Sequence, residues 1–232
     1  MKLLTLNTHS LIIPEHEAKR EIFVNFIAKE QPEVFALQEV NQTAAAPLLA
    51  EAPAGYYPCP GNTVLLKADN HAAAVAKMLE ARGVHYYWSW LPAKVGYDIY
   101  DEGAAVFSRA PITDAENLLL SQINDYSNWK TRRTLGICAG DVWYYTVHLG
   151  WWKLEGSQYG LLKHFSVTNE GSFVDGMKIS EVTLDDLKIP EHHSIRVKIG
   201  VKEDAEHMGG MNIFGKGFGN YDQGIVLRSY FN

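Results

Sequence analysis

Two polar residues stand at the ends of short apolar runs in this sequence, and their types suit a metal site. Asn7 closes the run "KLLTLN", and Glu39 follows the run "VFAL" that begins at Val34. Open α/β sheets bind ligands and place catalytic groups at the carboxyl ends of their strands. A carboxylate there can hold a hard cation such as Mg²⁺, which keeps several waters and needs few protein ligands. The alternative is that both residues only cap turns, because polar residues are common at strand ends.

A second group, Tyr100, Glu102 and His148, suits proton transfer. In "VWYYTVHL" the alternation of strand side chains puts His148 on the same face as Thr146, at the end of the run. A histidine there titrates near neutral pH and can pass a proton if a carboxylate such as Glu102 orients its other ring nitrogen. The alternative is a histidine at the rim of the core that hydrogen-bonds to the backbone.

The elements that must position these residues begin as strand, helix, strand. Residues 2–7 and 34–37 are near-continuous apolar runs, which are typical of strands covered on both faces. Between them, residues 15–30 predict a helix that ends before Pro32. The apolar stripe of this helix is expected to hold Ala18, Ile22, Phe23, Phe26 and Ile27.

Later signals extend the α/β pattern to about residue 152. A second helix is expected after Asp69 or Asn70 as N-cap, with Gly83 just beyond its end. Its apolar face would contain Val75, Met78 and Leu79. Aromatic and β-branched segments then predict strands: "VHYYWSW", "GAAVFSR", "TLGICAG" and "VWYYTVHL".

The character of the chain changes after Lys153. Residues 154–160 contain Gly and Ser and suit a linker, of natural or artificial origin. Residues 161–232 predict a β-rich part, because "KISEVTL", "HSIRVKIGV" and "GIVLRSYF" have strand length and are separated by glycine-rich turns. The expected organisation is therefore an α/β part over residues 1–153, a join, and a β-rich part.

Composition narrows the function classes. The 232 residues carry a formal net charge of -6, with a pI near 5.8, which argues against a broad basic surface for nucleic acid. Cys59 and Cys138 are far apart and lack metal-ligand spacing, so neither a disulfide framework nor a zinc site is indicated. The N-terminus turns polar too soon for a signal peptide, and no apolar run approaches ~18 residues. A cytoplasmic protein is expected.

The stretches "LLTLNTH", "FALQEVNQ", "YDEGAAVFSRAPI" and "YYTVHLGWW" follow one another within the first 152 residues. Motif by motif, they resemble the endonuclease/exonuclease/phosphatase superfamily, the metal-dependent phosphoesterases that include pancreatic-type deoxyribonuclease and the neutral sphingomyelinases. The resemblance implies a two-sheet α/β sandwich that cleaves phosphate esters with Mg²⁺, for which Mn²⁺ can stand in.

The resemblance also implies roles for the residues singled out above. Glu39 would be the metal ligand, and Asn7 would lie beside the metal and the phosphate. Tyr100 would contact the phosphate. His148, oriented by Glu102, would bind the phosphate or donate a proton.

The family pattern is incomplete downstream. Its Asp-x-Asn element and its terminal Ser-Asp-His, which position and activate the attacking water, do not occur after Trp152. The glycine-rich end, "GGMNIFGKGFGNYDQGIVLRSYF", instead resembles the C-terminal ligand-sensing region of ArsR-type bacterial regulators. A half sandwich would expose an apolar face, so we expect strands from the last part to cover it or the chain to form a homo-oligomer.

These observations predict a Mg²⁺-dependent phosphoesterase-superfamily protein that acts on a phosphate mono- or diester, with the missing motifs arguing against turnover. The alternative is a non-catalytic ligand-binding or sensor protein, or a chimera that carries an inactive phosphoesterase fragment. No membrane span is expected in either case.

Overall fold

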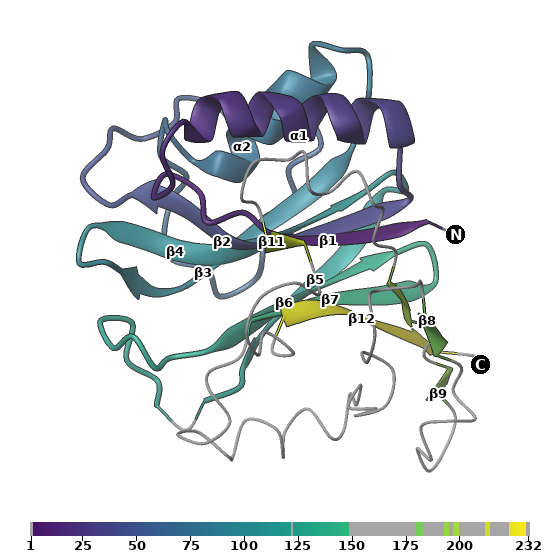
Figure 1. Ribbon diagram of the computed structural model, residues 1–232. Helices are drawn as coiled ribbons and strands as arrows, with labels where there is room; N and C mark the ends of the chain where they lie inside the picture. The colour runs from purple at the N-terminus through teal and green to yellow at the C-terminus, as the bar shows by residue number, and fades with distance from the viewer. Residues whose placement is uncertain are drawn as a thin grey trace.

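The computed structural model describes residues 2–121 and 123–148, together with the backbone of five short strands between residues 180 and 230. Two β-sheets stack on each other, and two helices cover the outer face of one of them (Figure 1). The strand order is β11-β1-β2-β4-β3 in the first sheet and β5-β6-β7-β12-β9 in the second. This arrangement confirms the predicted two-sheet α/β sandwich.

The first sheet holds the strands that carry Asn7, Glu39, Tyr100 and Glu102. Strand β1 (Leu3–Asn7) runs parallel to β2 (Val34–Thr43), and β4 (Tyr100–Ser108) pairs antiparallel with both β2 and β3 (Tyr87–Gly96). Helices α1 (His16–Glu30) and α2 (His71–Glu80) lie on its outer face (Figure 1). Asn7 is the last residue of β1, as predicted, whereas β2 continues to Thr43, so Glu39 lies within its strand and not at the expected strand end.

The second sheet consists of β5 (Ile112–Leu119), β6 (Arg133–Ala139), β7 (Val142–His148), β12 (Gln223–Tyr230) and β9 (His193–Ser194). Strand β12 pairs antiparallel with β7, and β11 (Asn212–Ile213) pairs with β1. Strands β8 (Ser180–Val182) and β10 (Val197–Ile199) form a separate pair. Strands β8 to β12 fall within the three C-terminal segments predicted to be strands and within the glycine-rich end. The other predictions for residues 149–232 lie outside the described residues, and the division into parts stays a prediction.

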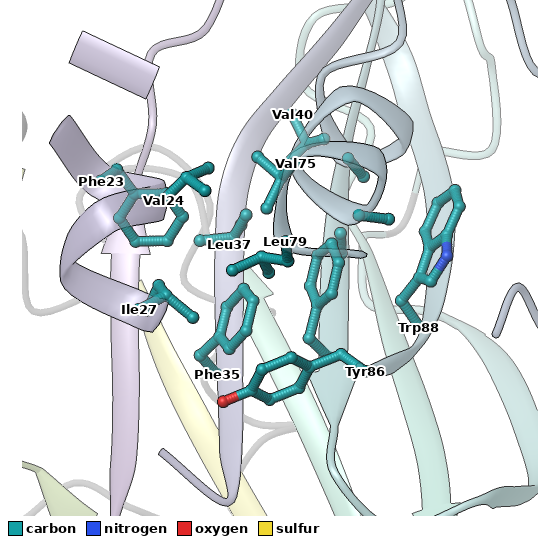
Figure 2. Close-up of a cluster of buried hydrophobic side chains, with 14 of the residues drawn as sticks. Phe23, Val24, Ile27, Phe35, Leu37, Val40, Val75, Leu79, Tyr86 and Trp88 are labelled. Atoms are coloured by element: carbon teal, nitrogen blue, oxygen red, sulfur yellow. The ribbon is translucent and has the colours of Figure 1, made fainter. Parts of the chain in front are cut away.

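The alternation of side chains along β2 divides the core into two layers. Phe35 and Leu37 point toward the helices and pack against Phe23, Val75 and neighbouring apolar side chains (Figure 2). Val34 and Ala36 belong instead to a second apolar cluster, which contains residues of both sheets. Because both faces of β2 are covered by apolar side chains, its sequence reads as a continuous apolar run.

Both helices form where the sequence predicts them, but the buried face of α1 matches the predicted apolar stripe only in part. In α1 the buried residues are Phe23, Val24 and Ile27, whereas Ala18 and Ile22 are exposed, so the predicted stripe was wrong at these two positions. Successive helix residues are about 100° apart, and a face centred between Phe23 and Val24 turns Ile22 toward solvent.

Asn70 is the N-cap of α2, as predicted, and its side chain accepts a hydrogen bond from the N–H of Ala73.

Strand β5 was missed, because this edge strand carries polar side chains such as Asp114 and Glu116. Within the described part of the chain, neither helix combines the length and apolar character needed to cross a lipid bilayer.

His71, the first residue of α2, is a polar group enclosed by the helix layer. Only 1% of it is exposed, and neither ring nitrogen has a hydrogen-bond partner within the described part. Burial, reinforced by the nearby positive charges of Arg20 and His16, lowers the pKa of His71 to about 3. The side chain is therefore neutral in the folded protein near pH 7.

The burial of His71 makes stability depend on pH. Between its ordinary pKa of 6.5 and about 3, the unfolded chain binds a proton that the folded chain does not. The free energy of unfolding therefore falls as the pH falls, by about 2 kcal/mol at pH 5 from this group. We predict that His71→Leu loses correspondingly less stability than wild type between pH 7 and pH 5, measured by urea unfolding. His85→Leu is the control, because the His85 side chain is 42% exposed. Equal pH dependence of His71→Leu and wild type would contradict the prediction.

Candidate active site

A β-bulge in the central strand β2 places Glu39. The pairing of β2 with β4 shifts its register between Gln38 and Val40, and Glu39 between them has a positive φ of 50°. Leu37 and Val40 both lie in the cluster beneath the helices, so one extra residue interrupts the two-residue period. Bulges of this kind re-aim side chains next to functional sites. Simple alternation would have pointed Glu39 toward the helices with Leu37.

The segment that follows β1 holds this bulge through its hydroxyl groups. Thr8 Oγ1 donates to the carbonyls of Gln38 at 2.9 Å and Glu39 at 3.0 Å. Ser10 Oγ donates to the carbonyl of Glu39 at 2.8 Å and accepts from the N–H of Asn41 at 2.8 Å. The carbonyls of Gln38 and Glu39 and the N–H of Asn41 are thereby hydrogen-bonded, as buried irregular backbone requires.

Three side chains surround the carboxylate of Glu39. Asn7 Nδ2 donates to Oε1 at 2.8 Å, and His9 Nδ1 lies 2.5 Å from Oε2. His148 Nε2, at the end of β7 in the other sheet, lies 3.7 Å from Oε1. Residues far apart in sequence, on β1, β2 and β7 and in the segment after β1, thus meet at one edge of the sandwich.

These contacts keep Glu39 ionised despite its burial. Burial alone would raise the pKa of this carboxyl group, but hydrogen bonds from His9 and Asn7 and the charge of His148 lower it to about 2. The hydrogen bond to Glu39 raises the pKa of His9 above its ordinary value, against the effect of burial. Burial lowers the pKa of His148, and the charges of Glu39 and Glu102 offset this only in part. Among the contacts that lower the pKa of Glu39, the hydrogen bond from His9 has the largest effect.

A second bulge, in β3, brings a lysine to Glu102. The pairing of β3 with β4 shifts between Pro92 and Lys94, and Lys94 Nζ lies 2.7 Å from Glu102 Oε1. The Glu102 side chain is buried and that of Lys94 is largely so, with 7% and 12% exposed. Gly96 leaves room for Glu102, because a Cβ there would lie 2.6 Å from Glu102 Oε2. Gly103 lets β3 approach β4 closely, because a Cβ there would lie 2.6 Å from the Cα of Pro92.

The structure brings only some of the predicted site residues together. Asn7, Glu39 and His148 converge, as described above. Glu102 is paired with Lys94, and its predicted role in orienting His148 stays a prediction. Tyr100 donates its hydroxyl to the carbonyl of Leu11 at 3.3 Å, so its predicted contact with phosphate also stays a prediction.

Sequence reasoning missed His9 and Lys94. A signal for His9 was present, because "NTHS" places four side chains capable of hydrogen bonding directly after a strand end. Lys94 could have been found from hairpin pairing. Once Gly96 is opposite Tyr100, Lys94 must be opposite Glu102.

The residues at this edge fit a divalent cation such as Mg²⁺. Glu39 offers an ionised carboxylate whose two oxygens together accept up to about four hydrogen bonds or metal contacts, of which Asn7 and His9 use two. The amide oxygen of Asn7 is a second hard ligand atom for a metal, although it also accepts a hydrogen bond from the N–H of His9 at 3.0 Å. Within the described residues, no three His, Cys, Asp or Glu side chains gather to bind a metal by themselves, so water or substrate oxygens would complete the coordination.

Comparison with known proteins decides the family. The sequence profile of the Endonuclease/Exonuclease/phosphatase family matches residues 4–196. The chain belongs to this family. The match runs past residue 152, where the four motifs end. The resemblance of the C-terminal part to ArsR-type regulators stays a prediction. None of the curated proteins matches the chain.

One solved structure of an endonuclease/exonuclease/phosphatase family protein shares this fold. The chain is similar to a family protein from Leptotrichia buccalis C-1013-b, with a TM-score of 0.61 and 22% identity over 73% of this chain and 62% of that one. It therefore spans less than two thirds of that structure. A Beutenbergia cavernae DSM 12333 family protein gives a TM-score of 0.39, with 19% identity over 60% of this chain and 34% of that one. The structure of D. rerio TDP2, solved with a single-strand DNA product, gives a TM-score of 0.46. The identity is 12%, over 99% of this chain and 84% of that one.

The buried pair of Lys94 and Glu102 gives a prediction for stability. Lys94→Met leaves the Glu102 carboxylate without its cation, which we expect to lower the free energy of unfolding by about 3 kcal/mol. The double variant Lys94→Met, Glu102→Leu removes both charges and should be more stable than Lys94→Met alone. Urea unfolding of the two single variants and the double variant gives the coupling energy. Strictly additive effects would mean that the two side chains do not stabilise each other.

Proposed function

We propose that the protein hydrolyses a phosphate mono- or diester with a divalent cation bound at Glu39. One observation carries this proposal: Asn7 and His148, from strands of different sheets, converge on the ionised, largely buried carboxylate of Glu39. A buried carboxylate costs free energy unless it is paired or coordinates a metal, so such a group at a strand edge is a candidate for function. Family membership supports the same class of reaction.

Each residue of the site has a role in this reaction. A bound cation would neutralise charge on the phosphate oxygens. Glu39 would hold the cation, and the amide N–H of Asn7 would keep Oε1 in place through the 2.8 Å hydrogen bond. In hydrolysis a water oxygen bonds to phosphorus, the ester P–O bond breaks, and the leaving oxygen gains a proton. His148, whose Nε2 lies 3.7 Å from Glu39 Oε1, would contact a phosphate oxygen or pass this proton.

A second candidate is a protein that binds a phosphate compound without turning it over. The observation that favours it is the absence from the sequence of the Asp-x-Asn and Ser-Asp-His motifs, which supply the water-activating groups in the family. Such a protein would still need Glu39 and His148 to hold cation and phosphate. The two candidates therefore differ in turnover and share the binding site.

The proposal predicts turnover that depends on Glu39. Wild type with Mg²⁺ or Mn²⁺ should hydrolyse bis-p-nitrophenyl phosphate, and release of p-nitrophenolate measures the rate. Glu39→Gln keeps the shape of the side chain but loses the charge that binds the cation, so we expect a loss of about 100-fold or more. His148→Ala should lose turnover as well.

Glu33→Gln is a matched control, because Glu33 is an exposed carboxylate beside the opposite end of β2. It should retain the rate of wild type. Turnover that survives Glu39→Gln would overturn the metal assignment. A folded wild type that binds phosphate but shows no turnover would favour the second candidate.

A further inference from the structure

The tip of the β3–β4 hairpin has a strained backbone, because residues other than Gly or Asn adopt positive φ there. Tyr97 and Asp98 have φ values of 51° and 61°, and the N–H of Ile99 donates to the carbonyl of Gly96 at 3.2 Å to close the turn. Turns with positive φ usually employ Gly or Asn, since a side chain in this region is strained. For a bulky residue such as tyrosine, a positive φ is a genuine outlier.

The strained turn is held in place by the structure around it. Buried Asp101, directly after the turn, accepts from Tyr126 Oη at 2.7 Å and from Gln42 Nε2 at 2.9 Å. Two backbone hydrogen bonds brace the hairpin: Val95 N–H donates to the carbonyl of Tyr126 at 2.8 Å, and Ala44 N–H donates to that of Ile99 at 2.9 Å. Strain persists where surrounding contacts over-determine the backbone, and such positions cluster at functional sites.

The braced turn presents an aromatic ring to solvent beside the candidate active site. Tyr97 is 61% exposed, and its ring meets that of His9 edge-on, with centroids 6.4 Å apart and planes at 86°. His9 in turn contacts Glu39. One ring therefore separates Tyr97 from the carboxylate proposed to hold the cation. Neighbouring Ile99 is also exposed, by 53%.

A single exposed tyrosine on a protein surface needs no explanation. Here three independent features coincide: the strained backbone, the bracing at Asp101, and the contact with His9. An aromatic side chain fixed in advance loses little conformational entropy when it stacks on a ligand. Because Tyr97 is 61% exposed, much of its surface remains open to a planar partner.

Resting on the proposed function, we propose that Tyr97 selects phosphate esters whose organic group carries a planar aromatic ring close to the phosphate. The phosphate would lie at the cation near Glu39, and the ring would stack on Tyr97. Esters of polyols or aliphatic alcohols would lack this contact. Tyr97 is thus a specificity-determining residue of the same site.

Equilibrium binding of compounds that cannot be hydrolysed tests this without turnover. Phenylphosphonate and cyclohexylphosphonate carry the same charged group and six-carbon rings of similar size, but only the first ring is planar and aromatic. Titration calorimetry in the presence of Mg²⁺ gives the Kd of each. We expect wild type to bind phenylphosphonate at least about fivefold more tightly, in line with measured stacking on aromatic side chains.

Two variants at the same position isolate the ring. Tyr97→Phe keeps the aromatic face and should keep the preference. Tyr97→Asn removes the ring while favouring the left-handed backbone of the turn, so the fold should be retained and the two Kd values should agree within about twofold. The melting temperature of Tyr97→Asn should be no lower than that of wild type, which verifies that a lost preference does not reflect unfolding.

The outcomes separate this inference from the proposed function. If both phosphonates bind wild type and Tyr97→Asn with the same ratio, and binding is lost in Glu39→Gln, the phosphate site stands and the role of Tyr97 is overturned. If neither compound binds wild type, or if Glu39→Gln binds both unchanged, the proposed function fails and this inference fails with it.

Discussion

The single extra residue at Glu39 in β2 is the constraint on which the candidate site depends. Strand β2 is central in its sheet and covered on both faces, so an irregularity there must satisfy every backbone group it displaces. Residues 7–10 contribute to this: Thr8 and Ser10 donate to the carbonyls of the bulge, while Asn7 and His9 bind the carboxylate. Trp90 adds a hydrogen bond from its indole N–H to the carbonyl of Val40 at 3.0 Å. The side chain of Glu39 is therefore fixed by its own backbone and by its neighbours.

The second bulge, between Pro92 and Lys94, gives the adjacent carboxylate Glu102 a cationic partner. The two bulges flank Gly103, which pairs with Val40 on one side and with Pro92 on the other. A side chain at Gly103 would collide with β3, so the close approach of the strands requires glycine here. Buried ion pairs add little net stability, because desolvation offsets their attraction. Their value here lies in holding two carboxylates in fixed positions at one edge of the sheet.

The apolar runs were sufficient to predict two buried strands and the position of Asn7 at the end of the first, and the two-sheet sandwich was implied by the resemblance to the family. The position expected for Glu39, at a strand end, was wrong, because β2 continues to Thr43. The sequence was insufficient for the bulges. Alternation along β2 pointed Glu39 at the helices, and no local pattern in "FALQEV" marks the extra residue. The approach of His148 to Glu39 depends on how the two sheets stack, which local sequence does not encode. Strand β5 was not predicted from the sequence, because an edge strand can carry polar residues on both faces.

Strain in this molecule is concentrated where the site lies. Within the described residues, seven side-chain-bearing residues have positive φ. Two of them, Glu15 and Gln31, flank α1, where a left-handed residue ends or begins a helix. The other five belong to the bulge, to the segment after β1 and to the hairpin tip: His9, Leu11, Glu39, Tyr97 and Asp98.

These three pieces touch one another through the contacts of His9 with Glu39 and Tyr97. Strained backbone of this kind costs about 1–3 kcal/mol per residue and persists only where the rest of the fold is stable enough to hold it. The large apolar layer between the helices and the first sheet supplies that stability. The pleated part of the sheet can therefore remain regular while one edge is shaped for binding and chemistry.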